Sequence, residues 1–214
     1  MKRIQVLLCL VICIVMALNL AACGSAPQQE EEKEPETASA VQEDTADKAD
    51  DEPAVLENKT LVIVFSATGN TKAVAEKIAA VTDADMYEIL AKETYTEADL
   101  DWHDKNSRTT IEQNDPSSRP EIGNGEVSLE EYTTIYIGYP IWWGEEPRIM
   151  DTFVERYDFT GITMIPFCTS GSSGIGRSGR NLEEKAGSGN WLEGARFAGS
   201  ASEDEVRRWI DSLG

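Results

Sequence analysis

The feature that most constrains the fold is the alternation of apolar, β-branched segments with helical segments from residue 59 to the end of the chain. Strands that alternate with helices form βαβ units, which place the strands parallel in one sheet with right-handed crossovers. An uninterrupted apolar run such as 60–65 is typical of a sheet covered on both faces. The segments expected to form strands are 60–65, 85–90, 134–139, 162–167 and, more weakly, 195–198.

The spacing of apolar residues also predicts helices over 70–81, 147–157 and 202–213. Ser202 and Glu205 have the spacing of a capping box at the start of the last helix. The connection 91–133 is unusually long, and we expect a helix near 105–113 and a loop over 117–125. The sequence therefore predicts one α/β domain over residues 59–214.

Residues 1–22 have the layout of a secretory signal peptide, with a basic start and an apolar run from residue 4 to 18. That run is too short for a comfortable membrane span. The segment Leu20-Ala21-Ala22-Cys23 resembles the lipobox of bacterial lipoproteins, which implies that Cys23 is lipidated and anchors the mature chain to a membrane. An uncleaved anchor helix is the alternative. We expect an extracytoplasmic, lipid-anchored protein of the bacterial cell envelope.

Residues 23–58 are expected to comprise the lipidated cysteine and a disordered acidic tether. Residues 24–57 include twelve acidic residues, two lysines and no aromatic residue, a composition that cannot support a core. An acidic binding tail is the alternative.

The chain as a whole has a formal net charge of −20, which argues against nucleic-acid binding because phosphates require a basic face. Four cysteines and one histidine have no metal-site spacing, so we predict no metal.

Three loops should carry the chemistry, because open α/β sheets bind ligands beyond the carboxyl ends of their strands. The first loop follows strand 60–65 and opens a helix. Backbone amides at a helix start bind anions, and the absence of a lysine excludes a Walker A motif. Neutral donors of this kind suit one phosphate monoester; an ordinary Ser/Thr helix cap is the alternative. The first loop consists of Ser66, Ala67, Thr68, Gly69, Asn70 and Thr71.

The second loop follows strand 134–139 and consists of Pro140, Ile141, Trp142, Trp143 and Gly144. Adjacent side chains at a strand end point in opposite directions, so we expect one tryptophan ring to offer a stacking surface for a planar heterocycle. The alternative is that both rings pack under the following helix.

The third loop, Thr169 to Gly174, includes Ser170 and Gly171 and could bond the polar edge of a heterocycle. Taken alone, it could equally be a flexible surface loop.

Together, and in this order, the three loops resemble those of the flavodoxin family over about residues 59–214. The resemblance implies a flavodoxin-like, doubly wound, five-stranded parallel sheet with helices on both faces, and FMN as the cofactor. It implies that the phosphate is held by Ser66, Thr68, Asn70 and Thr71. It further implies that Trp143 flanks the isoalloxazine ring, that the Gly144 peptide meets flavin N5, and that the segment 169–171 bonds the pyrimidine edge.

One departure from the family concerns the outer face of the flavin. Many flavodoxins place a second aromatic residue in the third loop, but residues 169–180 contain none. We expect that face to be open, or to be covered by Tyr95 or Trp102 from the long connection. An open face admits a substrate or a hydride donor.

Several other features have an ordinary structural interpretation. The G-x-G-x-x-G pattern over 174–179 starts too far after its strand to be a dinucleotide fingerprint. We expect His103 to be an exposed loop residue and Cys168 to be a small buried hydrophobe. The pair Glu145-Glu146 is expected to be a solvated helix start.

Three functions follow as hypotheses. The favoured one is an FMN-binding electron-transfer protein, a monomer whose redox partner protein or small acceptor is unknown. The alternative is an FMN-dependent NAD(P)H oxidoreductase that reduces a quinone or another small acceptor, favoured by the long connection 91–133. The third is a binding module without a cofactor. Small size and the lack of a nicotinamide motif favour the carrier, for which no catalytic residue is assigned.

Overall fold

The structure is a computed structural model, and it describes residues 58–214. The expected signal peptide (1–22), the lipidation site Cys23 and the acidic tether up to residue 57 lie outside the described residues.

The described chain forms a parallel sheet in the order β2-β1-β3-β4-β5, with β6 also paired to β4. Since β5 and β6 follow each other along the same side of β4, they are two pieces of one interrupted fifth strand. This arrangement confirms the predicted five-stranded, doubly wound sheet. The strands are β1 (Lys59–Phe65), β2 (Asp85–Ile89), β3 (Tyr132–Pro140), β4 (Thr163–Thr169), β5 (Asn190–Trp191) and β6 (Ala195–Phe197).

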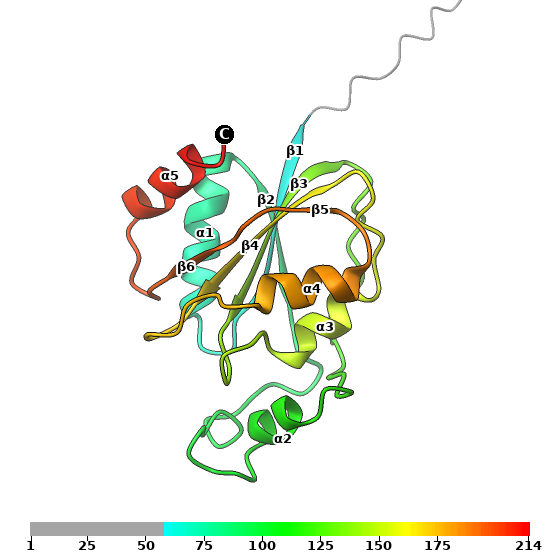
Figure 1. Ribbon diagram of the computed structural model, residues 1–214, viewed down its shortest axis with the longest axis vertical. Helices are drawn as coiled ribbons and strands as arrows, with labels where there is room; N and C mark the ends of the chain where they lie inside the picture. The colour runs from blue at the N-terminus through cyan, green and yellow to red at the C-terminus, as the bar shows by residue number, and fades with distance from the viewer. Residues whose placement is uncertain (1–57) are drawn as a thin grey trace, which may run out of the picture. The chain divides into compact units, whose positions relative to one another are not determined.

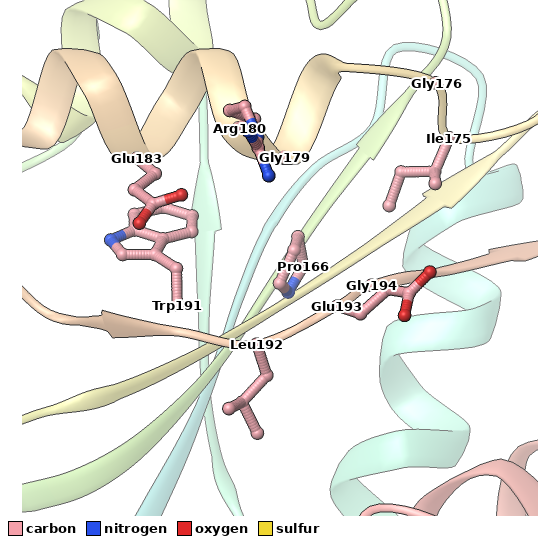
Figure 2. Close-up of a pocket in the computed structure, with 10 residues that line it drawn as sticks. All are labelled: Pro166, Ile175, Gly176, Gly179, Arg180, Glu183, Trp191, Leu192, Glu193 and Gly194. Atoms are coloured by element: carbon pink, nitrogen blue, oxygen red, sulfur yellow. The ribbon is translucent and has the colours of Figure 1, made fainter.

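The interruption of the fifth strand lies beside Pro166 in β4. The amide of Leu192 donates to the Met164 carbonyl at 2.9 Å. In a parallel ladder the next bond would run from the amide of residue 166 to the Leu192 carbonyl, and proline has no amide hydrogen. Gly194 then passes so close that a Cβ on it would lie 2.3 Å from the Pro166 carbonyl oxygen. Figure 2 shows Leu192 and Gly194 beside Pro166 at this break.

Helices cover both faces of the sheet, as predicted (Figure 1). One face packs against α1 (Asn70–Thr82) and α5 (Glu203–Asp211), and the other against α3 (Arg148–Val154) and α4 (Ser178–Ala186). The side chains of β1 alternate between these two cores, which explains its uninterrupted apolar sequence: Leu61, Ile63 and Phe65 face one core, and Val62 and Val64 face the other.

The long connection 91–133 does not cover the sheet with a helix. Its helix α2 (Arg108–Asn114) lies beyond the carboxyl ends of the strands, where it forms one side of the site described below (Figure 1). The predicted helix at 105–113 is therefore confirmed, with a later start at Arg108 because Ser107 caps it. Within residues 58–214 no helix has the length and apolar character needed to cross a bilayer.

Two helix predictions differ in outcome, and one helix was not predicted. The capping box of Ser202 and Glu205 is present at the start of α5, as predicted. Helix α3 ends at Val154 rather than near residue 157. Helix α4 was not expected, because it has Leu182 as its one fully buried large apolar side chain and therefore shows little apolar periodicity.

Candidate functional site

The first loop joins β1 to α1 and leaves the start of that helix without a side-chain cap. Gly69 occupies the N-cap position in a left-handed conformation, with φ of 84°, and no side chain bonds the first turn. The alternative interpretation, an ordinary Ser/Thr cap, is therefore wrong. The first amides of a helix lack intrahelical partners, so this helix start remains able to donate to an anion. The buried Ser66 hydroxyl likewise has no hydrogen-bond partner among the described residues.

A buried hydroxyl pair connects the first loop to the third. The Oγ1 atoms of Thr71 and Thr169 lie 2.7 Å apart, and both side chains are buried. One hydroxyl must donate to the other, which leaves one hydroxyl hydrogen of the pair available to a further acceptor. Two predicted site residues almost a hundred positions apart are thus brought into direct contact.

A hollow of about 380 Å³ opens beside this pair. None of the described residues that line it carries a charge, which agrees with the neutral donor set predicted from the sequence. Gly199 in its wall approaches Asn70 so closely that a Cβ would lie 2.9 Å from Asn70 Oδ1. The lining consists of Thr68, Asn70, Pro140, Thr169, Ser170, Gly171, Ala198, Gly199 and Ser200.

The second loop contains a tight turn that holds Trp143 outward. Trp142 and Glu145 exchange two backbone hydrogen bonds, of 2.9 and 3.0 Å. Trp143 and Gly144 between them have φ values of 49° and 85°, and positive φ at both central positions is the mark of a type I′ turn. Trp143 is 45% exposed, whereas Trp142 packs edge-on against Phe65 and Tyr95. The expectation that the two rings point in opposite directions is confirmed.

A second hollow, of about 350 Å³, borders the first at Thr68 and is mostly apolar. Trp102 from the long connection forms part of its wall and is 69% exposed. Tyr95, the other aromatic residue considered as a cover, is instead buried beneath Trp142, and burial raises the pKa of its hydroxyl. The lining consists of Thr68, Leu100, Trp102, Thr109, Ile141, Trp142 and Trp143.

The third loop is held by a cation that sequence reasoning missed. Arg196 of β6 donates to the carbonyl oxygens of Ser170 and Gly171, at 2.5 and 2.8 Å, and to the Ser170 hydroxyl at 3.1 Å. The Ser170 hydroxyl also donates to the Ser173 carbonyl. Several polar groups of this loop are thus bonded within the protein. Gly174, also a predicted site residue, lines neither hollow.

Three other predicted residues line neither hollow. Ser66 and Ala67 line a separate space on the β2 side of β1, and Gly144 belongs to the turn beside Trp143. The segment Ala198–Ser200 was missed, although it follows the fifth strand. The rule that directed attention to the ends of the other strands applies equally there.

The second loop ends in a buried ionic cluster. The expectation that Glu145 and Glu146 form a solvated pair is therefore wrong for Glu146, whereas the Glu145 side chain is half exposed. Glu146 is fully buried; it accepts from Asn181 at 3.1 Å and lies 3.3 Å from Lys185. Asp151, also fully buried, has its pKa raised to about 6, chiefly because burial disfavours the carboxylate. The pairing was not foreseen because Lys185 lies on the unpredicted helix α4.

Two other expectations are confirmed. Cys168 is buried, and burial raises the pKa of its thiol to about 12, so it behaves as a hydrophobe rather than a nucleophile. His103 is an exposed loop residue. A further hollow, of about 430 Å³, lies between α4 and the broken fifth strand and contains none of the predicted cofactor residues (Figure 2). Gly176 and Gly179 of the G-x-G-x-x-G pattern, which is not expected to bind a dinucleotide, lie in its wall.

Comparison with known proteins gives one consistent family. The family model described as flavodoxin matches residues 59–213. A solved structure from Bacteroides uniformis, assigned as a flavoprotein, is 48% identical, with a TM-score of 0.69 over 72% of this chain and 98% of that one. A second, from Bacteroides eggerthii and assigned likewise, is 43% identical, with a TM-score of 0.68 over 73% of this chain and 98% of that one.

A more distant match has a stated ligand. A flavoprotein from Lactobacillus acidophilus, solved in complex with FMN, is 25% identical, with a TM-score of 0.54 over 72% of this chain and 99% of that one. A search among curated proteins gave no match.

Proposed function

Because this chain belongs to the flavodoxin family, we propose that it binds FMN at the carboxyl edge of its sheet and carries electrons in the bacterial envelope. The observation that carries the proposal is the pair of hollows that meet at Thr68. One is polar, uncharged and next to an uncapped helix start; the other is apolar and walled by tryptophans. A ligand in which a phosphate is joined to a planar ring requires a polar anion site next to an apolar, aromatic one.

The first loop would hold the phosphate. The donors are the open amides at the start of α1, the Thr68 hydroxyl and the Asn70 amide, which also donates to the Thr68 oxygen at 3.1 Å. Ser66, whose buried hydroxyl has no partner among the described residues, lines the neighbouring space beside β2. The hydrogen left over by the pair of Thr71 and Thr169 adds a further donor. Donors that are already fixed by the fold bind an anion without first having to be ordered.

The second loop would orient the ring. Trp143 projects from a tight turn, and a flat aromatic surface stacks on a planar heterocycle. Gly144 follows it with φ of 85° and is exposed, so its peptide lies at the accessible tip of the turn. When bound, FMN supplies the redox chemistry, while the chain binds, orients and partly shields it from water.

A second candidate function has one observation in its favour. Trp102 and Trp143 are both substantially exposed beside the same apolar hollow, so one side of the proposed ring site is accessible. An accessible ring suits an oxidoreductase that uses NAD(P)H to reduce a quinone or another small acceptor. Anaerobic addition of NADPH to the FMN-loaded protein separates the two: rapid bleaching of the flavin supports the oxidoreductase, and reduction by dithionite alone supports the carrier.

The test of the main proposal is a titration of the protein with FMN and with riboflavin, followed by flavin fluorescence. Riboflavin lacks the phosphate and should bind far more weakly. Thr68→Val removes one exposed hydroxyl and should weaken FMN binding by about tenfold, but riboflavin binding much less, although Thr68 also borders the ring hollow. Equal affinity for the two flavins would contradict the placement of the phosphate, and no flavin binding at all would favour a binding module without cofactor.

We also propose that the chain is anchored to the envelope membrane through Cys23, since Leu20-Ala21-Ala22-Cys23 has the lipobox pattern and an acidic tether-like segment follows. Replacing Cys23 by alanine should abolish lipidation and release the protein from the membrane fraction. A Ser25→Ala variant, two residues further on, is the matched control and should fractionate as the unaltered chain does. Unchanged membrane retention of Cys23→Ala would contradict the anchor.

A further inference from the structure

Gln113, near the end of α2, is buried and reaches the backbone of the second loop. Its Nε2 donates to the carbonyl oxygens of Trp142 and Glu146, each at 3.2 Å. Only the nitrogen of a carboxamide can donate, so two carbonyl acceptors fix which way the amide group lies. One side chain therefore binds both sides of the turn that carries Trp143.

Arg148 binds the backbone of the same residue. Its Nη2 donates to the backbone carbonyl of Gln113 at 3.0 Å and to the Glu145 carboxylate at 3.1 Å. Arg148 is itself buried, and the carboxylates of Asp151 and Glu146 lie 3.5 and 4.0 Å from its Nη1. The backbone of Gln113 is thus bonded to α3 while its side chain binds the turn.

A second set of contacts joins α2 to the base of the same turn. The Tyr95 hydroxyl donates to Glu112 at 2.7 Å, and the Arg108 guanidinium lies 3.9 Å from the centre of the Tyr95 ring. The Tyr95 ring in turn meets Trp142 edge-on, with 5.2 Å between centroids. Through these contacts the long connection packs under the turn as well as bonding to it.

The turn requires such support because its backbone is strained. Trp143 and Asp83 are the two non-glycine residues within 58–214 that have a left-handed φ, and Asp83 ends a helix, where that conformation is common. A bulky residue persists in this conformation only where its surroundings hold it. Gln113 holds the turn by binding the carbonyl oxygens of Trp142 and Glu146, on either side of it.

We infer that Gln113 is a positioning residue for the proposed ring site, because it fixes the strained turn that projects Trp143 and thereby makes the connection 91–133 part of the site. Its effect on FMN rests on the proposed function, but its effect on the turn does not. Gln113 itself lines neither hollow, so it would act through the turn and without touching the flavin.

The test uses amide hydrogen exchange of Trp142 and Glu145 in the flavin-free protein, measured by NMR, together with FMN titration. Gln113→Met keeps the size but removes the donor; Gln113→Asn keeps the amide but shortens its reach, and serves if the first variant folds poorly. Both should speed exchange of the two turn amides by about tenfold and weaken FMN binding by a similar factor. Ser107→Ala, which removes the cap of α2, is the matched control and should speed exchange within α2 alone.

Turn amides that exchange at the original rate in both Gln113 variants would overturn the inference. So would an equal effect of Ser107→Ala on the turn, because general loosening of α2 would then explain the result. An unaltered protein that fails to bind FMN would instead reject the proposed function, and the exchange measurement would still decide the role of Gln113 in holding the turn.

Discussion

The contact between Thr71 and Thr169 gives two hydroxyls a structural role in addition to the binding role that we propose for them. Thr71→Val keeps the side-chain shape but leaves the buried Thr169 hydroxyl without a partner, at a cost of about 1–3 kcal/mol in the free energy of unfolding. It should also weaken FMN binding. Thr71→Ser should restore much of both, because it returns the hydroxyl. Urea unfolding and FMN titration measure the two effects, and a Thr71→Val protein as stable as the original would contradict the pairing.

Trp143 is expected to be a residue retained for binding at the expense of stability. Trp143→Gly places the residue best suited to φ of 49° at that position and relieves about 1–2 kcal/mol of backbone strain. Loss of the exposed ring should nevertheless weaken FMN binding, while the melting temperature stays constant or rises.

Trp142→Gly is the control for this prediction. That ring packs against Phe65 and Tyr95, so its removal should lower stability by about 2 kcal/mol or more. If Trp143→Gly were destabilised to the same degree, Trp143 would be a core residue and not a stacking surface.

At the scale of the helices, Asp151 makes the packing of α3 against α4 dependent on pH. The groups that face it are Lys185 of α4, Arg148 of α3, Arg119 of the connection, and Glu146. Its pKa is raised to about 6 from an ordinary value of 3.8, so the folded state binds the proton more tightly than the unfolded state does. The stability contributed by this group is therefore present below pH 4 and is lost as the pH rises through about 6.

Asp151→Asn should remove this dependence. Relative to the original chain, the variant should gain about 2–3 kcal/mol in the free energy of unfolding between pH 4 and pH 7. Urea unfolding of both proteins at each pH gives the difference, in which the opposite contributions of exposed acids such as Glu155 and Asp158 cancel. A constant difference across this range would show that Asp151 does not titrate as its burial requires.

The elements that could be predicted from the sequence are those whose own residues signal them. The apolar run of β1 and the capping box of α5 are local patterns, and both were predicted. Helix α4 lacks such a pattern because it buries little apolar surface of its own. Strand β5 lacks one because it is only two residues long. Their positions are determined by what they pack against.

The same division applies to the candidate site. The residues brought to the carboxyl edge could be predicted because strand order alone places the loops together. The role of Gln113 and the contacts of Arg196 could not, because each depends on a side chain that reaches a backbone carbonyl far away in the sequence. The burial of Glu146 was missed for the same reason.

At the scale of the whole molecule, residues 58–214 contain 15 basic and 27 acidic residues, a net charge of −12. Adding an electron to a flavin in such a field is unfavourable, so we expect the second reduction step of bound FMN to have a lower potential than that of free FMN. Added salt should reduce this shift by screening. A potential at or above the free-FMN value would contradict the expectation and favour the oxidoreductase.

Two single charges near the loops should move this potential in opposite directions. Arg196 is bonded to the third loop, so Arg196→Gln should lower the potential on the order of tens of millivolts, while Arg196→Lys should change it less. Glu145 lies in the second loop, and Glu145→Gln should raise it. Glu146 is unsuitable for this purpose because it is buried beside Lys185. Shifts of the same sign for Arg196→Gln and Glu145→Gln would exclude an electrostatic origin.

The broken fifth strand has a consequence for the behaviour of the protein in concentrated solution. A sheet edge that offers a long row of unpaired backbone groups recruits strands from other molecules and promotes aggregation. Here that edge consists of two residues in β5 and three in β6, separated by residues 192–194. A strand from a second copy would lose its regular partners after two or three residues. Pro166, which interrupts the pairing of β4 with the fifth strand, thus also discourages polymerisation through this edge of the sheet.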